Sequence, residues 1–302
     1  MLRAAIDIGS NSVRLLVASV TGGEFQPLFR LLDTTRLHDG LDAHGNLSAE
    51  SMARTAGAIA GFAAKARDAG VRDEDIFAFA TSAVRDAANG RDFMAAVKAD
   101  CGVDISLLTG EQEAAYAFYA AARPGECGVV DIGGASTEMI CGCDGRVRAA
   151  HSAQMGAVRL RRMLGEGASV ERMLEQSAAV LEPGIRALGA LPEQFVGVAG
   201  TITTLCALDM ELKEYSPERI QGAWLSRESA ERWLKRLAPM SIADRRALPG
   251  MPARRAEIID YGAAIVVSFL RLTGLCGLYV SDRDNLYTAI MRPDKADSGE
   301  NN

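Results

Sequence analysis

Apolar residues in the first part of the chain come in short runs that end in polar or glycine-containing turns. Two such runs cover residues 2–8 and 13–20, and the turn Thr21-Gly22-Gly23 leads into a third run over 25–31. Short β-rich runs separated by turn residues are typical of β-hairpins. The pattern therefore predicts a hairpin that is extended by a third strand.

A segment with apolar positions at helical spacing comes next. Ser48 is a suitable N-cap and Gly70 a suitable C-terminal stop for a helix over residues 48–69. Its predicted buried face consists of Met52, Ala56, Ile59, Ala63 and Ala66. The same reasoning predicts later strands over 76–80, 103–107, 195–199 and 275–280, and helices over 91–99, from 110 onward, and over 170–188, 227–237 and 254–273.

One arrangement of residues occurs twice. In each copy an apolar strand delivers an aspartate, which is followed by Ile-Gly, a turn of small residues and a second strand. The copies are Ala5-Ile6-Asp7-Ile8-Gly9-Ser10-Asn11-Ser12 and Gly128-Val129-Val130-Asp131-Ile132-Gly133-Gly134-Ala135-Ser136-Thr137-Glu138. They lie about one domain length apart. We therefore expect duplicated α/β domains over 1–123 and 124–302, with the final residues able to pack back on the first domain and a frayed polar tail after Pro293.

The repeated turn has the chemistry of a phosphate site. A glycine after the aspartate lets the backbone approach a ligand closely, and successive N–H groups with hydroxyls form an anion cradle. The carboxylate can hold a hydrated Mg²⁺ that bridges to phosphate. A single such turn is more often an ordinary hairpin. Two copies a domain apart favour a phosphate-binding protein.

Composition narrows the classes of function. The net charge of −6 argues against a large nucleic-acid face, which needs clustered Lys and Arg. The six cysteines form no CxxC pair, and the three histidines are scattered, so reduced thiols in a cytoplasm are expected and a His/Cys zinc site is not. We expect no signal peptide, because the opening apolar stretch is broken at Asp7 and Arg14. We expect no membrane span, because the apolar run over 262–270 is too short to cross a bilayer. We expect a soluble cytoplasmic protein.

The two copies resemble the two phosphate loops of the actin/sugar-kinase/heat-shock-protein superfamily. More narrowly, the chain resembles the exopolyphosphatase / guanosine pentaphosphate phosphohydrolase (Ppx/GppA) family, in a short two-domain form, because four further motifs occur in the family's order. These are ATSAVRDAANG at 80–90, LTGEQEA at 108–114, MGAVRL at 155–160 and AGTITTL at 199–205. The resemblance implies two ribonuclease H-like domains of the actin-like ATPase type, with a cleft between them.

The resemblance also implies roles for individual residues. Glu113 falls on the family's catalytic glutamate, the general base for the attacking water, and Asp131 falls on the carboxylate associated with the metal and that water. Glu138 matches a further acidic position, and Arg85 an arginine that faces the anionic substrate. The implied phosphate-binding residues are Asp7, Gly9, Ser10, Asn11, Ser12, Arg85, Gly133, Gly134, Ala135, Ser136, Thr137, Gly200 and Thr201. The implied metal is Mg²⁺ or another divalent cation, with Asp131 and Asp7 as ligands.

Phosphoryl transfer fits these roles, because it needs neutralised phosphate oxygens and an in-line water. A glutamate close to Asp131 would have its pKa raised by the like charge and would be a better base near neutrality. Simpler interpretations exist. Glu113 could be a solvated acid on a first helical turn, Arg85 could pair with Asp86 or Asp92, and Thr201 could cap a helix. Arg161 and Arg162 are expected on a solvated helix face.

Two departures from the family pattern bear on turnover. Ala135 stands where the family usually has a third glycine, so its methyl would crowd a phosphate if the turn needed a left-handed residue. Near the C-terminus the family pattern Gly-Leu-Arg-Glu-Gly is replaced over residues 284–288, Asp-Asn-Leu-Tyr-Thr. If the helical extension of long family members holds long polymer, this short form should prefer shorter chains or nucleotides.

The sequence thus favours an Mg²⁺-dependent exopolyphosphatase that removes terminal phosphate from polyphosphate. The rivals are a guanosine pentaphosphate phosphohydrolase, a weakly catalytic sensor of polyphosphate or an alarmone, and a small-molecule kinase of the same superfamily. The kinase is disfavoured because no acceptor-binding insert stands out. The expected ligands are polyphosphate or a guanosine polyphosphate, with no nucleic acid and no membrane, and a homodimer is compatible with the sequence.

Overall fold

A computed structural model describes residues 1–37 and 44–291 of the protein. It divides into two compact units, with Met1–Tyr116 and the C-terminal segment from Asn285 in unit 1 and Ala117–Asp284 in unit 2. The division lies inside the helix over Gly110–Ala121, earlier than the boundary at 123/124 expected from the sequence. The tail after Pro293 lies outside the described residues.

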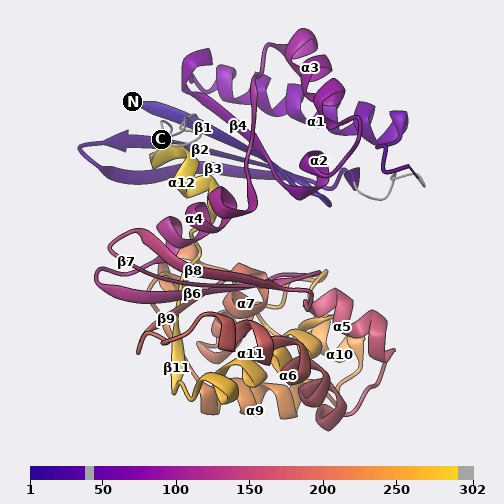
Figure 1. Ribbon diagram of the computed structural model, residues 1–302, viewed down its shortest axis with the longest axis vertical. Helices are drawn as coiled ribbons and strands as arrows, with labels where there is room; N and C mark the ends of the chain where they lie inside the picture. Colours follow the sequence, from indigo (N-terminus) through magenta and orange to yellow (C-terminus); the bar gives the residue numbers. More distant parts are fainter. Residues whose placement is uncertain (38–43, 292–302) are drawn as a thin grey trace. The chain divides into compact units, whose positions relative to one another are not determined.

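Unit 1 is built on a five-stranded sheet with the order β3-β2-β1-β4-β5 (Figure 1). The strands are β1 (Leu2–Ile8), β2 (Val13–Thr21), β3 (Glu24–Asp33), β4 (Ile76–Ala80) and β5 (Ile105–Leu107). β1, β2 and β3 pair in antiparallel fashion, and β4 and β5 run parallel to β1. The predicted hairpin with a third strand is confirmed.

The helices of unit 1 are α1 (Ala49–Asp68), η2 (Asp73–Asp75), α2 (Ser82–Arg85), α3 (Gly90–Cys101), the first part of α4 (Gly110–Ala121), and α12 (Asn285–Met291). The three helices predicted in unit 1 are present as α1, α3 and α4, and η2, α2 and α12 were not predicted. The predicted N-cap of α1 is confirmed, because the Ser48 hydroxyl accepts from the Ser51 amide at 3.1 Å. The buried face of α1 is rotated from the prediction, since Thr55 and Phe62 are buried while Met52 and Ala56 are only half-buried.

Alternation along β1 sends its side chains to two separate cores. Ala4, Ile6 and Ile8 belong to the core beneath α1 and α3. Ala5 belongs to a second core with Leu286 and other residues of α12, which covers the opposite face of the sheet (Figure 1). Asp7 follows Ala5 by two residues on the strand and therefore shares its face.

The C-terminal helix α12 is tied to unit 1 by buried polar contacts. The Thr288 hydroxyl donates to the Tyr116 carbonyl at 2.7 Å, and Arg3 Nη1 donates to the Ile290 carbonyl at 2.7 Å. Phe25 and Tyr287 meet edge to face, with ring centroids 4.8 Å apart. Residues 285–288 of the segment that replaces the family's Gly-Leu-Arg-Glu-Gly pattern thus belong to a helix that packs on the sheet.

Unit 2 contains a six-stranded sheet with the order β10-β11-β9-β6-β7-β8 (Figure 1). The strands are β6 (Glu126–Ile132), β7 (Thr137–Cys143), β8 (Arg146–Ala153), β9 (Phe195–Val198), β10 (Trp224–Ser226) and β11 (Gly277–Val280). β6, β7 and β8 form an antiparallel meander, and β9 runs parallel to β6 and β11. Both sheets therefore begin with the same antiparallel arrangement of three strands.

One large apolar core lies between this sheet and the helices. The helices are α5 (Ala157–Leu164), α6 (Val170–Ala187), α7 (Ala199–Asp209), α8 (Pro217–Ile220), α9 (Arg227–Leu237), α10 (Ile242–Arg246) and α11 (Ile259–Thr273). Val130 and Ile132 of β6 join this core, so Asp131 between them lies on the opposite face of the sheet. No helix within residues 1–37 and 44–291 has the length and apolarity needed to cross a membrane.

The helix predicted over 254–273 begins five residues late. Residues 253–258 form turns instead, in which the Arg255 amide donates to the Pro252 carbonyl at 2.8 Å and the Ile259 amide donates to the Arg255 carbonyl at 2.9 Å. Pro252 supplies no amide for an earlier helical turn. Several strand ends also differ from prediction. For example, β5 starts at Ile105, β11 starts at Gly277 and β9 ends at Val198.

Candidate active site

The first phosphate loop connects β1 to β2 in unit 1. The Gly9 amide donates to the Ser12 carbonyl at 3.0 Å, which closes the turn. Ser10 and Asn11 at its tip are exposed, and Ser12 is half-buried. The tip of the turn therefore exposes the polar side chains of Ser10 and Asn11.

The second loop connects β6 to β7 in unit 2 and repeats this geometry. The Gly133 amide donates to the Ser136 carbonyl at 3.0 Å, the same bond at the same place in the repeat. Gly134 and Ser136 are half-buried, and Ala135 is exposed. Thr137 differs from its predicted role, because its buried hydroxyl donates to the Met155 carbonyl at 2.6 Å and so fixes the loop.

Helix α5 is hydrogen-bonded to the second loop. This contact explains why the Met155–Leu160 motif occurs together with the loop in the sequence. The Ala157 amide donates to the Gly133 carbonyl at 3.0 Å, and the Val158 amide donates to the Gly134 carbonyl at 2.9 Å. Gly156 lies so close that a β-carbon there would collide with the Gly134 backbone. Helix α5 thus fixes the loop through the carbonyls of Gly133 and Gly134 and not through the loop amides, which are the groups that bind an anion.

The two repeated aspartates have different partners across their hairpins. Asp7 lies opposite Arg14, and the two form an ion pair in which Asp7 is buried. Asp131 lies opposite Glu138, whose Oε1 accepts from the Ser152 hydroxyl at 2.8 Å. Directly opposite residues of an antiparallel pair share a face. Unit 2 therefore carries two carboxylates side by side, and unit 1 a carboxylate with a cation.

This difference bears on where a metal would bind. Mg²⁺ is usually held by one or two carboxylates together with waters and substrate phosphate, which Asp131 and Glu138 can supply. Asp7 is less suited because Arg14 already balances its charge. Within the described part of the chain, no three His, Cys, Asp or Glu side chains gather as a complete metal site.

Arg85 and Glu113 come together in unit 1. Arg85 ends α2, and its Nη1 lies 3.7 Å from Glu113 Oε2 on the first turn of α4. The same Nη1 donates to the Leu108 carbonyl at 2.8 Å, and Arg85 Nε lies 3.3 Å from Asp86. The surface pair with Asp86 is thus present, but Arg85 is also fixed toward the predicted base.

The third cluster of predicted residues lies at the start of α7. Thr201 does not cap this helix, which begins at Ala199 without a side-chain cap. Its side chain is buried and packs against Gly262 of α11. The Thr201 hydroxyl thus serves packing, and the contribution of this segment to anion binding would come from its backbone amides at the helix N-terminus.

Arg255 is a site residue that sequence reasoning missed. Its guanidinium lies directly over Gly200, where a β-carbon would collide with it. Burial lowers the pKa of Arg255, as does the neighbouring Arg254, whereas the Asp131 carboxylate raises it. Arg255 is therefore a half-buried cation within the electrostatic reach of Asp131. In the sequence, the indication of Arg255 was the pair of arginines, Arg254 and Arg255, that precedes the apolar segment of α11.

The backbone strain in this region lies at Ala199 rather than at Ala135. Ala199, the first residue of α7 and directly after β9, has φ +68, whereas Ala135 is not among the non-glycine residues with positive φ. The methyl group of Ala135 is exposed and needs no left-handed backbone. The substitution of the family's third glycine therefore leaves the second loop unstrained.

Comparisons with known proteins identify the family of the chain. The sequence profile of the Ppx/GppA phosphatase family matches residues 16–276. Exopolyphosphatase 2 of Mycobacterium tuberculosis is 34% identical over 94% of this chain and 95% of its own length. A guanosine-5'-triphosphate,3'-diphosphate pyrophosphatase of Vibrio atlanticus is 31% identical over 90% of this chain and 55% of its own length.

Solved structures show the same architecture. A crystal structure of the Aquifex aeolicus Ppx/GppA phosphatase covers 96% of this chain and 98% of its own, with a TM-score of 0.87 and 28% identity. The predicted α/β fold of two actin-like domains is therefore confirmed, and the protein is a phosphoanhydride hydrolase. The chain belongs to the Ppx/GppA phosphatase family.

Proposed function

We propose that the protein is an Mg²⁺-dependent exopolyphosphatase that releases terminal phosphate from inorganic polyphosphate. The observation that carries this proposal is the pairing of a phosphate loop with two adjacent carboxylates, Asp131 and Glu138, in unit 2. The 34% identity to an exopolyphosphatase over nearly the whole of both chains supports the choice of substrate.

The residues of each unit would supply a separate part of the reaction. Loop amides of Gly134 and Ala135 bind the phosphate oxygens, and Asp131 and Glu138 would hold a divalent cation, which would supply positive charge beside those oxygens. Glu113 takes the proton of the attacking water as general base. Arg85, fixed by the Leu108 carbonyl, orients Glu113 and adds positive charge.

A substrate panel tests the proposal. Purified protein is given polyphosphates of several lengths and guanosine pentaphosphate, with Mg²⁺ and with a chelator, and released phosphate is measured. The proposal predicts release from polyphosphate only when the metal is present. Absence of release from every polyphosphate at saturating Mg²⁺ would exclude it.

Guanosine pentaphosphate hydrolysis is the second candidate, because the Vibrio atlanticus relative carries the name of a guanosine pyrophosphatase. The same panel separates the two by the ratio of kcat/KM for the two substrates. Tight binding of polyphosphate without release would instead support the sensor hypothesis.

A further inference from the structure

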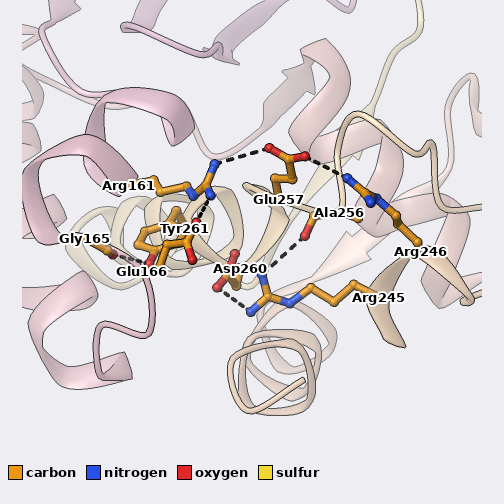
Figure 2. A network of polar contacts seen from close by, with 9 residues as sticks. All are labelled: Arg161, Gly165, Glu166, Arg245, Arg246, Ala256, Glu257, Asp260 and Tyr261. Carbon is orange, nitrogen blue, oxygen red and sulfur yellow. Dashed lines mark hydrogen bonds and ion pairs between the residues drawn. The ribbon is translucent and has the colours of Figure 1, made fainter. Parts of the chain in front are cut away.

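Glu257 joins two arginines from different helices of unit 2 (Figure 2). Arg161 Nη1 donates to Glu257 Oε2 at 3.3 Å, and Arg246 Nη2 donates to Glu257 Oε1 at 2.7 Å. Arg161 belongs to α5 and Arg246 to α10. A single exposed ion pair stabilises little, but a carboxylate held from two helices fixes its own backbone in place.

The partner Arg161 connects this bridge to the second phosphate loop. It was expected on a solvated helix face, but its side chain is only 25% exposed and pairs with Glu166 as well as Glu257. It lies one turn after the start of α5, where the amides of Ala157 and Val158 bind the loop carbonyls. Helix α5 is therefore a rigid link between the loop and Glu257.

A buried ion pair holds the same turns at a second point (Figure 2). Arg245 Nη2 donates to Asp260 Oδ2 at 2.6 Å, and Arg245 Nη1 donates to the Ala256 carbonyl at 3.3 Å. Both side chains are buried. The backbone of Ala256, between Arg255 and Glu257, is thus anchored in the interior while the Glu257 side chain is anchored near the surface.

We propose, on the basis of the proposed function, that Glu257 is a positioning residue that sets the Arg255 guanidinium over Gly200, within electrostatic reach of Asp131. Arg255 contacts the anionic substrate, and Glu257 acts only through Arg255. The turns over 253–258 lack the continuous hydrogen-bond ladder of a helix, so side-chain anchors determine where Arg255 lies. A displacement of about 1 Å at such a group is enough to weaken its action on the substrate.

The test is a double-mutant cycle on the full chain, with the Kd for inorganic tripolyphosphate as the main measurement. Glu257→Gln should weaken binding roughly fivefold, a size typical of coupled neighbours. Arg255→Gln should weaken it by more. Adding Glu257→Gln to Arg255→Gln should cost less than about twofold further, because the group that Glu257 positions is already gone.

Glu166→Gln is the matched control. Glu166 also pairs with Arg161, but its side chain is 72% exposed and it belongs to neither the 253–258 turns nor α11. Its removal should leave the Kd near that of the parent. In phosphate release, Glu257→Gln should raise KM and leave kcat nearly unchanged, the pattern of a lost contact that is equally strong in the ground and transition states.

The outcomes separate this inference from the proposed function. A parent that hydrolyses polyphosphate but shows additive effects in the cycle, or a Glu257→Gln variant with the parent's Kd, overturns the positioning role and leaves the function intact. A parent that releases no phosphate but binds tripolyphosphate with a non-additive cycle supports the positioning role and overturns the function. A parent that binds no tripolyphosphate overturns both.

Discussion

Arg85 Nη1 lies 3.7 Å from Glu113 Oε2, so the predicted general base of unit 1 has a cation beside it. The arginine cannot move freely, because the same nitrogen donates to the Leu108 carbonyl at 2.8 Å. Fixed charge next to a catalytic carboxylate orients it at little cost in reorganisation. The pair thus gives Glu113 a defined direction before any substrate binds.

Replacement of Glu113 by Gln should abolish most phosphate release while the fold is kept. The amide keeps the shape of the side chain but cannot take a proton from water, and general-base catalysis contributes roughly 10²–10⁴-fold. We expect kcat to fall by about that factor. The measurement is steady-state phosphate release, with thermal unfolding as a check on folding.

Glu111→Gln is the matched control for this variant, because Glu111 occupies the same first turn of α4 and is exposed. It should retain nearly the parent's kcat. Equal kcat values for Glu113→Gln and the parent would remove Glu113 from the role of base.

The Gly156→Ala substitution should damage the second phosphate loop. A β-carbon at residue 156 would collide with the backbone of Gly134, and backbone cannot yield as a flexible side chain can. We expect a loss of about 1–3 kcal/mol in the free energy of unfolding, together with a weaker Kd for tripolyphosphate. Urea unfolding and calorimetric binding measure the two effects.

Gly61→Ala provides the comparison for a glycine with free space around it. Gly61 lies inside α1, and no atom lies within 4 Å of a β-carbon there. Alanine should stabilise this helix by about 1 kcal/mol without a change in binding. If Gly156→Ala behaved like Gly61→Ala, the contact between Gly156 and the loop would contribute neither to stability nor to tripolyphosphate binding.

Strain at the turn between β9 and α7 should be relieved by Ala199→Gly. Alanine at φ +68 is in the left-handed region, which costs an L-residue about 1–2 kcal/mol. Part of the gain is offset because glycine has more freedom in the unfolded chain. We expect a net increase of about 0.5–1 kcal/mol in the free energy of unfolding, measured by urea titration.

Ala135→Gly is the control here, because Ala135 does not have a positive φ. It should give no gain and a small loss from chain entropy. A loss of stability in Ala199→Gly equal to that in Ala135→Gly would show that the Ala199 backbone is not strained.

The sequence revealed the parts of the site that are local. Each phosphate loop is a continuous strand–Asp–Ile–Gly turn, so Asp7 and Asp131 and their loops could be placed from adjacent residues alone. The bond from Gly9 to Ser12 and its counterpart from Gly133 to Ser136 follow from that local pattern. The order of strands and most helices was predictable for the same reason.

The parts that depend on distant contacts were not predictable. The apolar spacing predicted that α11 begins at Arg254, whereas it begins at Ile259. The turns that place Arg255 over Gly200 were therefore missed. Arg161 looked like an exposed helix residue because nothing nearby in sequence indicates Glu257 as its partner. Likewise, Thr201 is a plausible cap by position, but packing against Gly262 determines its role.

Alkaline pH should destabilise the protein through two buried thiols. Burial raises the pKa of Cys141 and of Cys206 from 9.0 to about 11. Between these values the thiols of the unfolded chain lose protons while those of the folded protein keep them, so the unfolded state is favoured as pH rises. The free energy of unfolding should therefore fall between about pH 9 and pH 11, and the contribution of these thiols to the decline should end above the folded pKa.

Urea unfolding across this range checks the prediction with a Cys141→Ala/Cys206→Ala variant. Removal of both thiols can lower the overall stability because it leaves small cavities, but the decline with pH should become shallower. Cys276→Ala is the control, because the Cys276 thiol is exposed, and it should keep the parent's slope. A double variant whose stability falls as steeply as the parent's would assign the alkaline loss to other groups, such as Tyr261, whose pKa is also raised by burial.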